Sequence, residues 1–218
     1  MFITFEGLDG SGKTTVLELF TEYLLKKYSH IETLFTREPG GKGIKEAEQI
    51  REIILHKDSD LSAKTEALLY TSSRRIHLEK VIIPALKDNK LVICDRYIDS
   101  FYAYQGFGRD LGLEFVETIT ELILEKTYPD ITVFLEISPE QAKERRNAGR
   151  LIQNRLDDEA DEFHKKVYKG YHHLINRNPE RFLIIDATKP LKDVFDELIS
   201  KIEANEAFKD YITKYAKR

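Results

Sequence analysis

Short apolar runs rich in β-branched and aromatic residues recur along the chain, and stretches with the spacing of amphipathic helices separate them. Each run has the length of a strand and is apolar throughout, without alternating polar residues. Strands of this kind are buried on both faces, which is typical of a parallel sheet covered by helices. The pattern predicts an α/β fold with a mostly parallel five-stranded sheet, flanked by helices on both faces, whose strands lie at residues 2–5, 33–35, 91–94, 131–135 and 182–185.

Helices are predicted where apolar residues return at intervals of three and four and where proline or glycine marks an end. In a parallel sheet with helical crossovers, ligands bind outside the carboxyl ends of the strands, so the segments that follow the strands are the candidates for a site. Residues 205–218 are amphipathic but carry weak boundary signals, and no function is assigned to them. The predicted helices are residues 13–27, 45–56, 63–87, 113–125, 139–147, 158–176 and 191–204.

Composition narrows the class of protein and its partners. A chain of 218 residues with 41% hydrophobic residues suits one globular domain with a substantial core. Its apolar runs are far shorter than the roughly 20 residues that a membrane helix needs. The formal net charge of −4 argues against broad nucleic-acid binding, which needs a basic face. A membrane protein and a nucleic-acid-binding protein are therefore not expected.

The start of the chain and its single cysteine indicate the cellular compartment in which the protein works. No basic region with a small-residue cleavage site precedes the first apolar run, so secretion is not expected. A lone cysteine, Cys94, excludes an internal disulfide framework and cysteine-based zinc ligation. It fits a reducing environment, and we expect a cytoplasmic protein in which Cys94 packs in the core.

A glycine-rich segment between the first strand and the first helix fits the pattern G-x-x-x-x-G-K-[ST]. A strand before the pattern and a helix after it are the context in which it cradles nucleotide phosphates. Backbone N–H groups converge on phosphate oxygens, the lysine reaches the β- and γ-phosphates, and the threonine can bind Mg²⁺. The alternative is a chance glycine-rich turn, and the correct flanks argue against it. The candidate ATP-binding residues are Gly7, Leu8, Asp9, Gly10, Ser11, Gly12, Lys13 and Thr14.

Asp95 and Arg96 follow the third predicted strand directly. At the carboxyl end of a central strand, the carboxylate of Asp95 can face the phosphate loop and hold Mg²⁺ or its water shell. The guanidinium of Arg96 can bridge two phosphates and stabilise the charge that moves between them. A salt-bridged strand end is the alternative interpretation of an isolated Asp-Arg pair.

Three further segments carry candidate groups for the acceptor substrate. Arg37 and Glu38 end the second strand, before a turn of proline and glycines. Arg51 lies in a helix whose isoleucines point to the core, so it is equally compatible with a solvated charge. Tyr70 and Arg74 are four residues apart on a long helix, which places a ring beside a guanidinium that could clamp a nucleobase. Aromatic residues at helical spacing also occur as plain core residues.

Residues 145–158 form a basic segment with four arginines and no lysine. Its glycine and asparagines lie between two predicted helices, which favours a mobile basic loop. Such a lid could cover ATP and supply charge to the transferred phosphoryl group. A solvated run of charges is the alternative, but arginine is the residue preferred for bidentate phosphate contacts. The four arginines are Arg145, Arg146, Arg150 and Arg155.

Taken together, several blocks of the sequence resemble the bacterial thymidylate kinase family in order and spacing. They are residues 5–15 around the phosphate loop, 36–41 at the second strand, 95–97 with Ser100, and 103–106. The similarity runs from Met1 to about Ile202 and includes residues 154–157 and 185–187. The resemblance implies a P-loop kinase that transfers the γ-phosphate of Mg·ATP to dTMP in dTTP biosynthesis, and it implies a homodimer.

The resemblance also implies roles for residues that match the family motifs. Asp9 would approach the acceptor sugar, Tyr70 would stack on thymine, and Arg74 would approach the base edge. The ring of Tyr104 would crowd the sugar 2′ position and favour deoxyribose, and Gln105 would lie near the base. The implied dTMP-binding residues are Asp9, Arg37, Glu38, Arg51, Tyr70, Arg74, Arg96, Ser100, Tyr104 and Gln105.

Catalytic groups follow from the same resemblance. Members of the family whose phosphate loop lacks an arginine, as here with Leu8 and Ser11, carry a catalytic arginine on the lid. Arg150 and Arg155 are the candidates, although residues 154–157 vary on the frequent Asp-Arg-x-Glu motif. The expected catalytic set is Lys13, Asp95, Arg96, Arg150 and Arg155, with Thr14 and Asp95 at Mg²⁺, partly through water.

Two rival functions compete with this interpretation. A different nucleoside monophosphate or deoxynucleoside kinase shares the phosphate loop, but Tyr70, Tyr104 and Gln105 favour dTMP. A nucleotide-dependent switch has no need of an ordered acceptor site of arginines and aromatic rings. One departure bears on the base: Phe101 stands where many family members have a small polar residue near the thymine.

Overall fold

The computed structural model of the protein describes residues 1–41, 43–149 and 159–215. Its centre is a five-stranded sheet in the order β2-β3-β1-β4-β5, in which every neighbouring pair is parallel. The predicted α/β fold is confirmed, and each strand runs one or two residues past its predicted end. The strands are β1 (Phe2–Glu6), β2 (Thr33–Arg37), β3 (Leu91–Asp95), β4 (Ile131–Glu136) and β5 (Phe182–Asp186).

The strand register brings chemical groups to one edge of the sheet. Asp95, the last residue of β3, is paired with Phe5 of β1 on one side and with Arg37 of β2 on the other. β1 lies in the middle of the sheet, between β3 and β4. The chain places β2 and β3 on one side of β1 and then crosses to the other side for β4 and β5. The carboxyl ends of β1, β2 and β3 therefore meet at the point where a parallel sheet of this kind binds its ligands.

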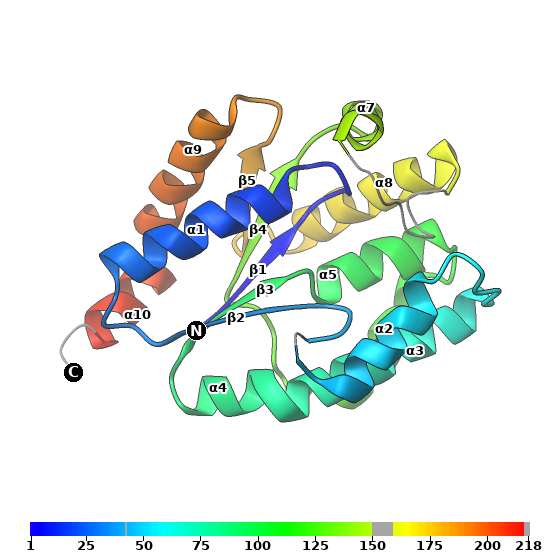
Figure 1. The fold of residues 1–218 in the computed structure, drawn as a ribbon, viewed down its shortest axis with the longest axis horizontal. Helices are drawn as coiled ribbons and strands as arrows, with labels where there is room; N and C mark the ends of the chain where they lie inside the picture. The colour runs from blue at the N-terminus through cyan, green and yellow to red at the C-terminus, as the bar shows by residue number, and fades with distance from the viewer. Residues whose placement is uncertain (42, 150–158, 216–218) are drawn as a thin grey trace.

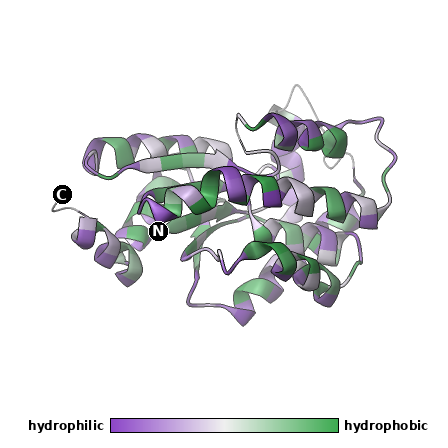
Figure 2. Cartoon of the chain, turned by 90° about the horizontal axis from the view of Figure 1, so that it is seen from below, coloured by the Kyte–Doolittle hydropathy of each residue, from purple (hydrophilic) through white to green (hydrophobic). Residues whose placement is uncertain are grey.

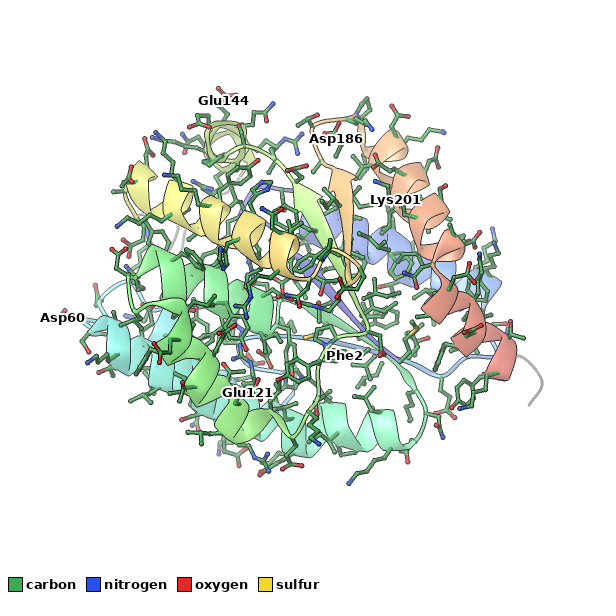
Figure 3. The ribbon with its side chains drawn as sticks, turned by 180° about the vertical axis from the view of Figure 1, so that it is seen from behind. Phe2, Asp60, Glu121, Glu144, Asp186 and Lys201 are labelled. Carbon is green, nitrogen blue, oxygen red and sulfur yellow. The ribbon has the colours of Figure 1, made fainter. Side chains whose placement is uncertain are left out.

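Helices connect the strands and cover both faces of the sheet. In Figure 1, α1 crosses in front of the strands with α9 beside it, and the two helices contact each other. Figure 3 shows the opposite face, where α8 lies in front of the sheet. The helices are α1 (Lys13–Lys27), α2 (Lys45–Leu55), α3 (Ala63–His77), α4 (Ile83–Lys87), α5 (Ile98–Phe101), α6 (Leu113–Leu124), α7 (Pro139–Gly149), α8 (Asp161–Arg177), α9 (Leu191–Ala204) and α10 (Glu206–Tyr215).

Apolar spacing explains why α1 lies against the sheet. Val16, Phe20 and Leu24 recur every four residues, and all three are buried. The strands between the helices are green in Figure 2, whereas the helices carry both colours, as their two-sided environment requires. Cys94 of β3 is buried in this core, as expected. In the described part of the chain, no helix has the length and apolar character needed to cross a membrane.

The single helix expected at 63–87 is divided by a π-helical turn. The segment η1 (Leu78–Ile82) separates α3 from α4. Pro84 lies just after this turn and has no N–H to donate, so the regular ladder of backbone hydrogen bonds cannot continue through it. A second π-helical segment, η2 (Tyr102–Gly108), continues α5 and was not predicted.

Two other segments differ from the prediction. Arg145 and Arg146 belong to the last turns of α7, which confirms the helix predicted at 139–147, whereas the loop expected at 145–158 is wrong for its first residues; 150–158 lie outside the described residues. The amphipathic tail forms α10, where Phe208 and Tyr211 are buried and the Tyr211 hydroxyl donates to the Asn89 carbonyl at 2.7 Å. Burial of an apolar face stabilises α10 without strong boundary signals.

Candidate active site

The phosphate loop connects β1 to α1 in the conformation that the motif requires. Gly12, the N-cap of α1, has a left-handed φ of 87°, so the helix N-terminus directly follows the loop. The Lys13 ammonium donates to the carbonyls of Gly7 and Leu8 at 3.1 and 3.3 Å. Burial, followed by the positive charge of Arg96, lowers the pKa of Lys13 to about 8. A buried ammonium of this kind is matched to an anion that restores its charge.

Leu8 and Ser11 belong to the loop without presenting a side chain to a ligand. Their side chains are 1% and 2% exposed, and neither they nor Gly7 line the pocket beside the loop. Their contribution to phosphate binding would therefore come from backbone N–H groups.

A pocket of about 630 Å³ lies at the carboxyl ends of β1, β2 and β3. Residues of α2, α3, α5, η2 and α7 complete its walls. Most of the site residues expected from the sequence line this one space, whereas Arg150 and Arg155 lie outside the described residues. Those that line it are Asp9, Gly10, Gly12, Lys13, Thr14, Arg37, Glu38, Arg51, Tyr70, Arg74, Asp95, Arg96, Ser100, Tyr104 and Gln105.

Arg96 joins the phosphate loop to the wall of this pocket. One guanidinium nitrogen, Nη2, donates to the Asp9 carboxylate at 2.9 Å and to the Tyr104 hydroxyl at 3.4 Å. The other, Nη1, donates to Ser100 Oγ at 2.8 Å. Burial alone would lower the pKa of Arg96, but the carboxylate of Asp9 raises it well above its usual value. The side chain is therefore a fixed positive charge directly beside the loop.

Arg74 is held by a buried carboxylate. Its Nε donates to Glu38 Oε2 at 2.8 Å, and the other oxygen of Glu38 lies 3.1 Å from Nδ1 of His77. In the described part of the chain, the buried Nη1 of Arg74 has no hydrogen-bond partner. Burial opposes the ionised form of Glu38, but Arg74 and His77 lower its pKa. Glu38, expected as an acceptor-side group, thus contacts Arg74 and His77 as well as lining the pocket.

Arg37 and Arg51 form a positively charged corner. Both donate to the carbonyl of Pro39, at 2.9 and 3.0 Å, and Arg37 also pairs with Glu48 at 2.8 Å. Burial, and next the positive charge of Arg37, lower the pKa of Arg51. Two neighbouring guanidiniums of this kind are a site for an anion. Arg51 is therefore half-buried at the pocket, which argues against the solvated-charge alternative.

Aromatic rings line the opposite side of the pocket. The rings of Tyr70 and Phe101 are 6.2 Å apart, and the Arg74 guanidinium lies 4.8 Å from the Phe101 ring. Gln105 also lines the pocket, but it is 1% exposed and its amide donates to Glu66 at 2.9 Å. The two tilted rings and the guanidinium form a wall against which a flat base could stack, and the Gln105 amide is already engaged by the Glu66 carboxylate.

Two oxygen-bearing side chains fit the Mg²⁺ that the motif implies. Within the described residues, Asp95 Oδ1 is a buried oxygen with no hydrogen-bond partner. Thr14 lines the same pocket. Carboxylate and hydroxyl oxygens are suitable Mg²⁺ ligands, and an ion of this kind usually keeps waters and phosphate oxygens as its remaining ligands. The residues present therefore fit the metal.

Two residues of α7, Arg145 and Arg146, line the pocket. Both are among the arginines of the predicted ATP-covering lid, but neither has a predicted role of its own. Figure 1 shows α7 beside the loop between β1 and α1. Their only sequence signal was membership of the arginine-rich segment, which does not say which of four arginines faces the loop.

A family model described as thymidylate kinase matches residues 5–198. The chain belongs to the thymidylate kinase family. It is 56% identical to the thymidylate kinase of Mycoplasmopsis agalactiae over 97% of this chain and 98% of that protein. It is 45% identical to the thymidylate kinase of Staphylococcus haemolyticus over 90% of this chain and 94% of the relative. Among solved structures, thymidylate kinase from Ehrlichia chaffeensis superposes with a TM-score of 0.75 at 34% identity, covering 93% of this chain and 98% of that one.

Membership of this family confirms the predicted fold and activity. The protein is an enzyme that phosphorylates dTMP to dTDP, uses ATP and serves nucleotide biosynthesis. The pocket places the phosphate loop and the arginine-lined and aromatic-lined walls in one continuous space, as a transfer between two nucleotides requires.

Proposed function

We propose that the γ-phosphate of ATP passes in line to the phosphate of dTMP at the point where Arg96 meets the phosphate loop. The observation that carries this proposal is the 2.9 Å ion pair between Arg96 Nη2 and Asp9 Oδ1. It ties an acceptor-side guanidinium to the loop that would hold the donor phosphates. Phosphoryl transfer depends on positioning and on stabilising charge, and Arg96 is placed for both.

On the donor side, the backbone N–H groups of residues 7–14 and the ammonium of Lys13 bind the phosphates of ATP. Thr14 and Asp95 would hold Mg²⁺, partly through water, and the bound ion would supply positive charge against the phosphates. Support comes from the buried ammonium of Lys13 and from Asp95 Oδ1, a buried oxygen with no hydrogen-bond partner in the part of the chain that the structure describes.

On the acceptor side, Arg37 and Arg51 bind the dTMP phosphate with Arg96. Tyr70 stacks on the thymine, and Arg74 donates to its edge. The buried Nη1 of Arg74, which has no hydrogen-bond partner among the described residues, supports the last assignment. Tyr104 lies against the sugar: its hydroxyl donates at 3.1 Å to Asp9, the residue that the family resemblance brings to the acceptor sugar.

The catalytic arginine of the lid is proposed from the family resemblance alone, because Arg150 and Arg155 lie outside the described residues. Residues 1–218 would form one P-loop kinase domain whose lid covers about 145–158. Arg155→Ala should lower kcat far more than it weakens ATP binding, as for a group that acts in the transition state. An unchanged kcat would remove Arg155 from the mechanism, and Arg150→Ala would then be the variant to measure.

We also propose that the enzyme is a cytoplasmic homodimer. Leu68 of α3 and Leu122 of α6 are 54% and 80% exposed, and exposed leucines on these two contacting helices could contact a second copy. Light scattering coupled to gel filtration should give twice the mass of one chain. A monomer at micromolar concentration would contradict this part of the proposal.

The test of the proposed reaction is ADP release from ATP with dTMP, dUMP, dCMP, dGMP and thymidine offered separately, with and without Mg²⁺. Turnover should be highest with dTMP and should need the metal. Preference for thymidine would indicate a deoxynucleoside kinase, and equal turnover without an acceptor would indicate an ATPase or switch. The matched variant Asp95→Asn should raise the Mg²⁺ concentration needed for half-maximal rate.

A further inference from the structure

A carboxylate lies buried behind Arg96, outside the pocket. Glu6 is the last residue of β1 and is 0% exposed. Its Oε1 accepts the Tyr97 N–H at 2.8 Å. Its Oε2 accepts two hydroxyl groups, that of Ser100 and, at 3.1 Å, that of Tyr171 from α8. Within the described residues, the carboxylate therefore does not line the pocket and hydrogen-bonds to Tyr97, Ser100 and Tyr171.

The same two hydroxyl groups contact Arg96. Nη1 of Arg96 donates to Ser100 Oγ at 2.8 Å and to the Tyr171 hydroxyl at 3.3 Å. The two hydroxyl oxygens are 2.8 Å apart. Glu6 and Arg96 are therefore connected through a pair of hydroxyls that belong to two different helices.

The number of available protons determines which groups donate and which accept in these hydrogen bonds. An ionised carboxylate only accepts hydrogen bonds, and each hydroxyl has a single proton to donate. If Ser100 and Tyr171 both donate to Glu6, no proton remains for the 2.8 Å contact between the two hydroxyl oxygens, and both oxygens present lone pairs to Arg96. The guanidinium only donates, so the two lone pairs match the two contacts that Nη1 makes.

We propose that Glu6 and Tyr171 are positioning residues for phosphoryl transfer: Glu6 orients the Ser100 and Tyr171 hydroxyls so that they hold Nη1 of Arg96, while Nη2 faces Asp9 and the substrates. This inference rests on the proposed role of Arg96 in binding the transferred phosphate. It concerns two residues whose side chains lie outside the substrate pocket.

Two observations indicate more than a structural role. The ionised form of Glu6, on which the direction of these hydrogen bonds depends, is costly in the core: burial, followed by the negative charge of Asp99, raises its pKa to about 7. Arg96 itself has a left-handed φ of 65°, a strained position for a residue with a side chain. The strained backbone of Arg96 and the buried carboxylate of Glu6 both act on the position of the Arg96 guanidinium. Such unfavourable features are typical of a functional site.

The decisive variant is Glu6→Gln. The amide oxygen stays at the Tyr97 N–H, because an amide nitrogen there would set two donors against each other. The NH₂ group therefore replaces Oε2, and the two hydroxyls must accept from it and turn their protons toward Arg96. We expect kcat with dTMP to fall about 10- to 100-fold, as for loss of hydrogen bonds to a charged group. The KM for ATP should change less than about threefold, because no group of the phosphate loop is altered.

Tyr171→Phe provides an independent variant in case Glu6→Gln fails to fold. It removes one lone pair and keeps the ring, which packs 5.0 Å from Phe134. The expected fall in kcat is smaller, about 3- to 10-fold. The control is Tyr168→Phe, which should leave kcat unchanged. Tyr168 is on the same helix but outside the hydrogen-bond relay formed by Glu6, Ser100, Tyr171 and Arg96.

A double-mutant cycle with Arg96→Lys separates the outcomes. If the relay acts through Arg96, Tyr171→Phe and Glu6→Gln should have little further effect on kcat in the Arg96→Lys background. Full additivity, or wild-type kcat in both single variants, would overturn the relay while leaving the role of Arg96 intact. Wild-type kcat in Arg96→Lys would instead contradict the proposed function of Arg96.

Discussion

The guanidinium of Arg146 donates a hydrogen bond of 2.8 Å to the backbone carbonyl of Asp9. Arg146 is 5% exposed and lies in the last turns of α7, where the chain leads into the arginine-rich segment. The contact ties this helix to the backbone of the phosphate loop.

Replacement of Arg146 by methionine should weaken ATP binding. Methionine keeps the apolar stem and removes the donor, and a hydrogen bond that involves a charged group contributes about 1.5 kcal/mol or more, or about tenfold in KM. Steady-state kinetics with varied ATP would measure it. Lys143→Met, on the exposed face of the same helix, is the control. Equal KM values for the two variants would show that the Asp9 contact does not order the loop.

Replacing Gly10 with alanine should destabilise the protein more than replacing Gly12 does. Gly10 and Gly12 both have a left-handed φ, of 95° and 87°, so alanine at either costs about 1–2 kcal/mol from the backbone. A Cβ at Gly10 would also lie 2.4 Å from the Ala142 carbonyl oxygen, whereas one at Gly12 would meet nothing within 4 Å. In urea unfolding without nucleotide, Gly10→Ala should lose about 1 kcal/mol or more beyond Gly12→Ala. Similar losses would mean that α7 moves aside easily.

The buried ion pair of Glu38 and Arg74 should matter more to folding than an exposed pair does. Their side chains are 5% and 2% exposed, and Glu38→Gln leaves the Arg74 charge without its partner. Breaking a buried pair in this way costs about 3 kcal/mol or more. The control is Glu79→Gln, which breaks a surface pair with Arg75 and should cost less than about 1 kcal/mol. Comparable free energies of unfolding for the two variants would contradict the assigned role of Glu38.

Tyr104→Phe should keep the preference for dTMP over TMP. The ring is 5% exposed and is held at 6.0 Å from the ring of Phe163, so it stays in place without its hydroxyl. The ratio of kcat/KM values for the two nucleotides should change less than about threefold. Tyr104→Ala should lower this ratio about tenfold or more, because the sugar 2′ position is no longer crowded. A large change in Tyr104→Phe would assign the selection to the hydroxyl instead.

The sequence predicted the sheet and the position of the pocket because both follow from local patterns. Buried parallel strands are apolar throughout, and the phosphate loop has a fixed spacing between glycine and lysine. Arg37 and Asp95 could be expected to meet, since each ends a strand of the same sheet. The family resemblance added Tyr104 and Gln105, which no spacing rule would have selected.

Other features depend on contacts between distant segments and have no local signal. Glu6 looks like the polar end of an apolar strand, and only the packing of α8 shows that Tyr171 reaches it. The contact between Arg146 and Asp9 joins residues 137 positions apart. Helix α10 was missed because its stability comes from burial of Phe208 and Tyr211 and not from its ends.

Asp9 links the two halves of the active site through different atoms. Its carbonyl oxygen is held by Arg146, and its carboxylate is held by Arg96 and Tyr104. If ATP shifts this residue and thereby alters the affinity for dTMP, dTMP must alter the affinity for ATP by the same factor, because the two bindings close a thermodynamic cycle. One aspartate thus makes cooperation between the two substrates reciprocal, whichever of them binds first.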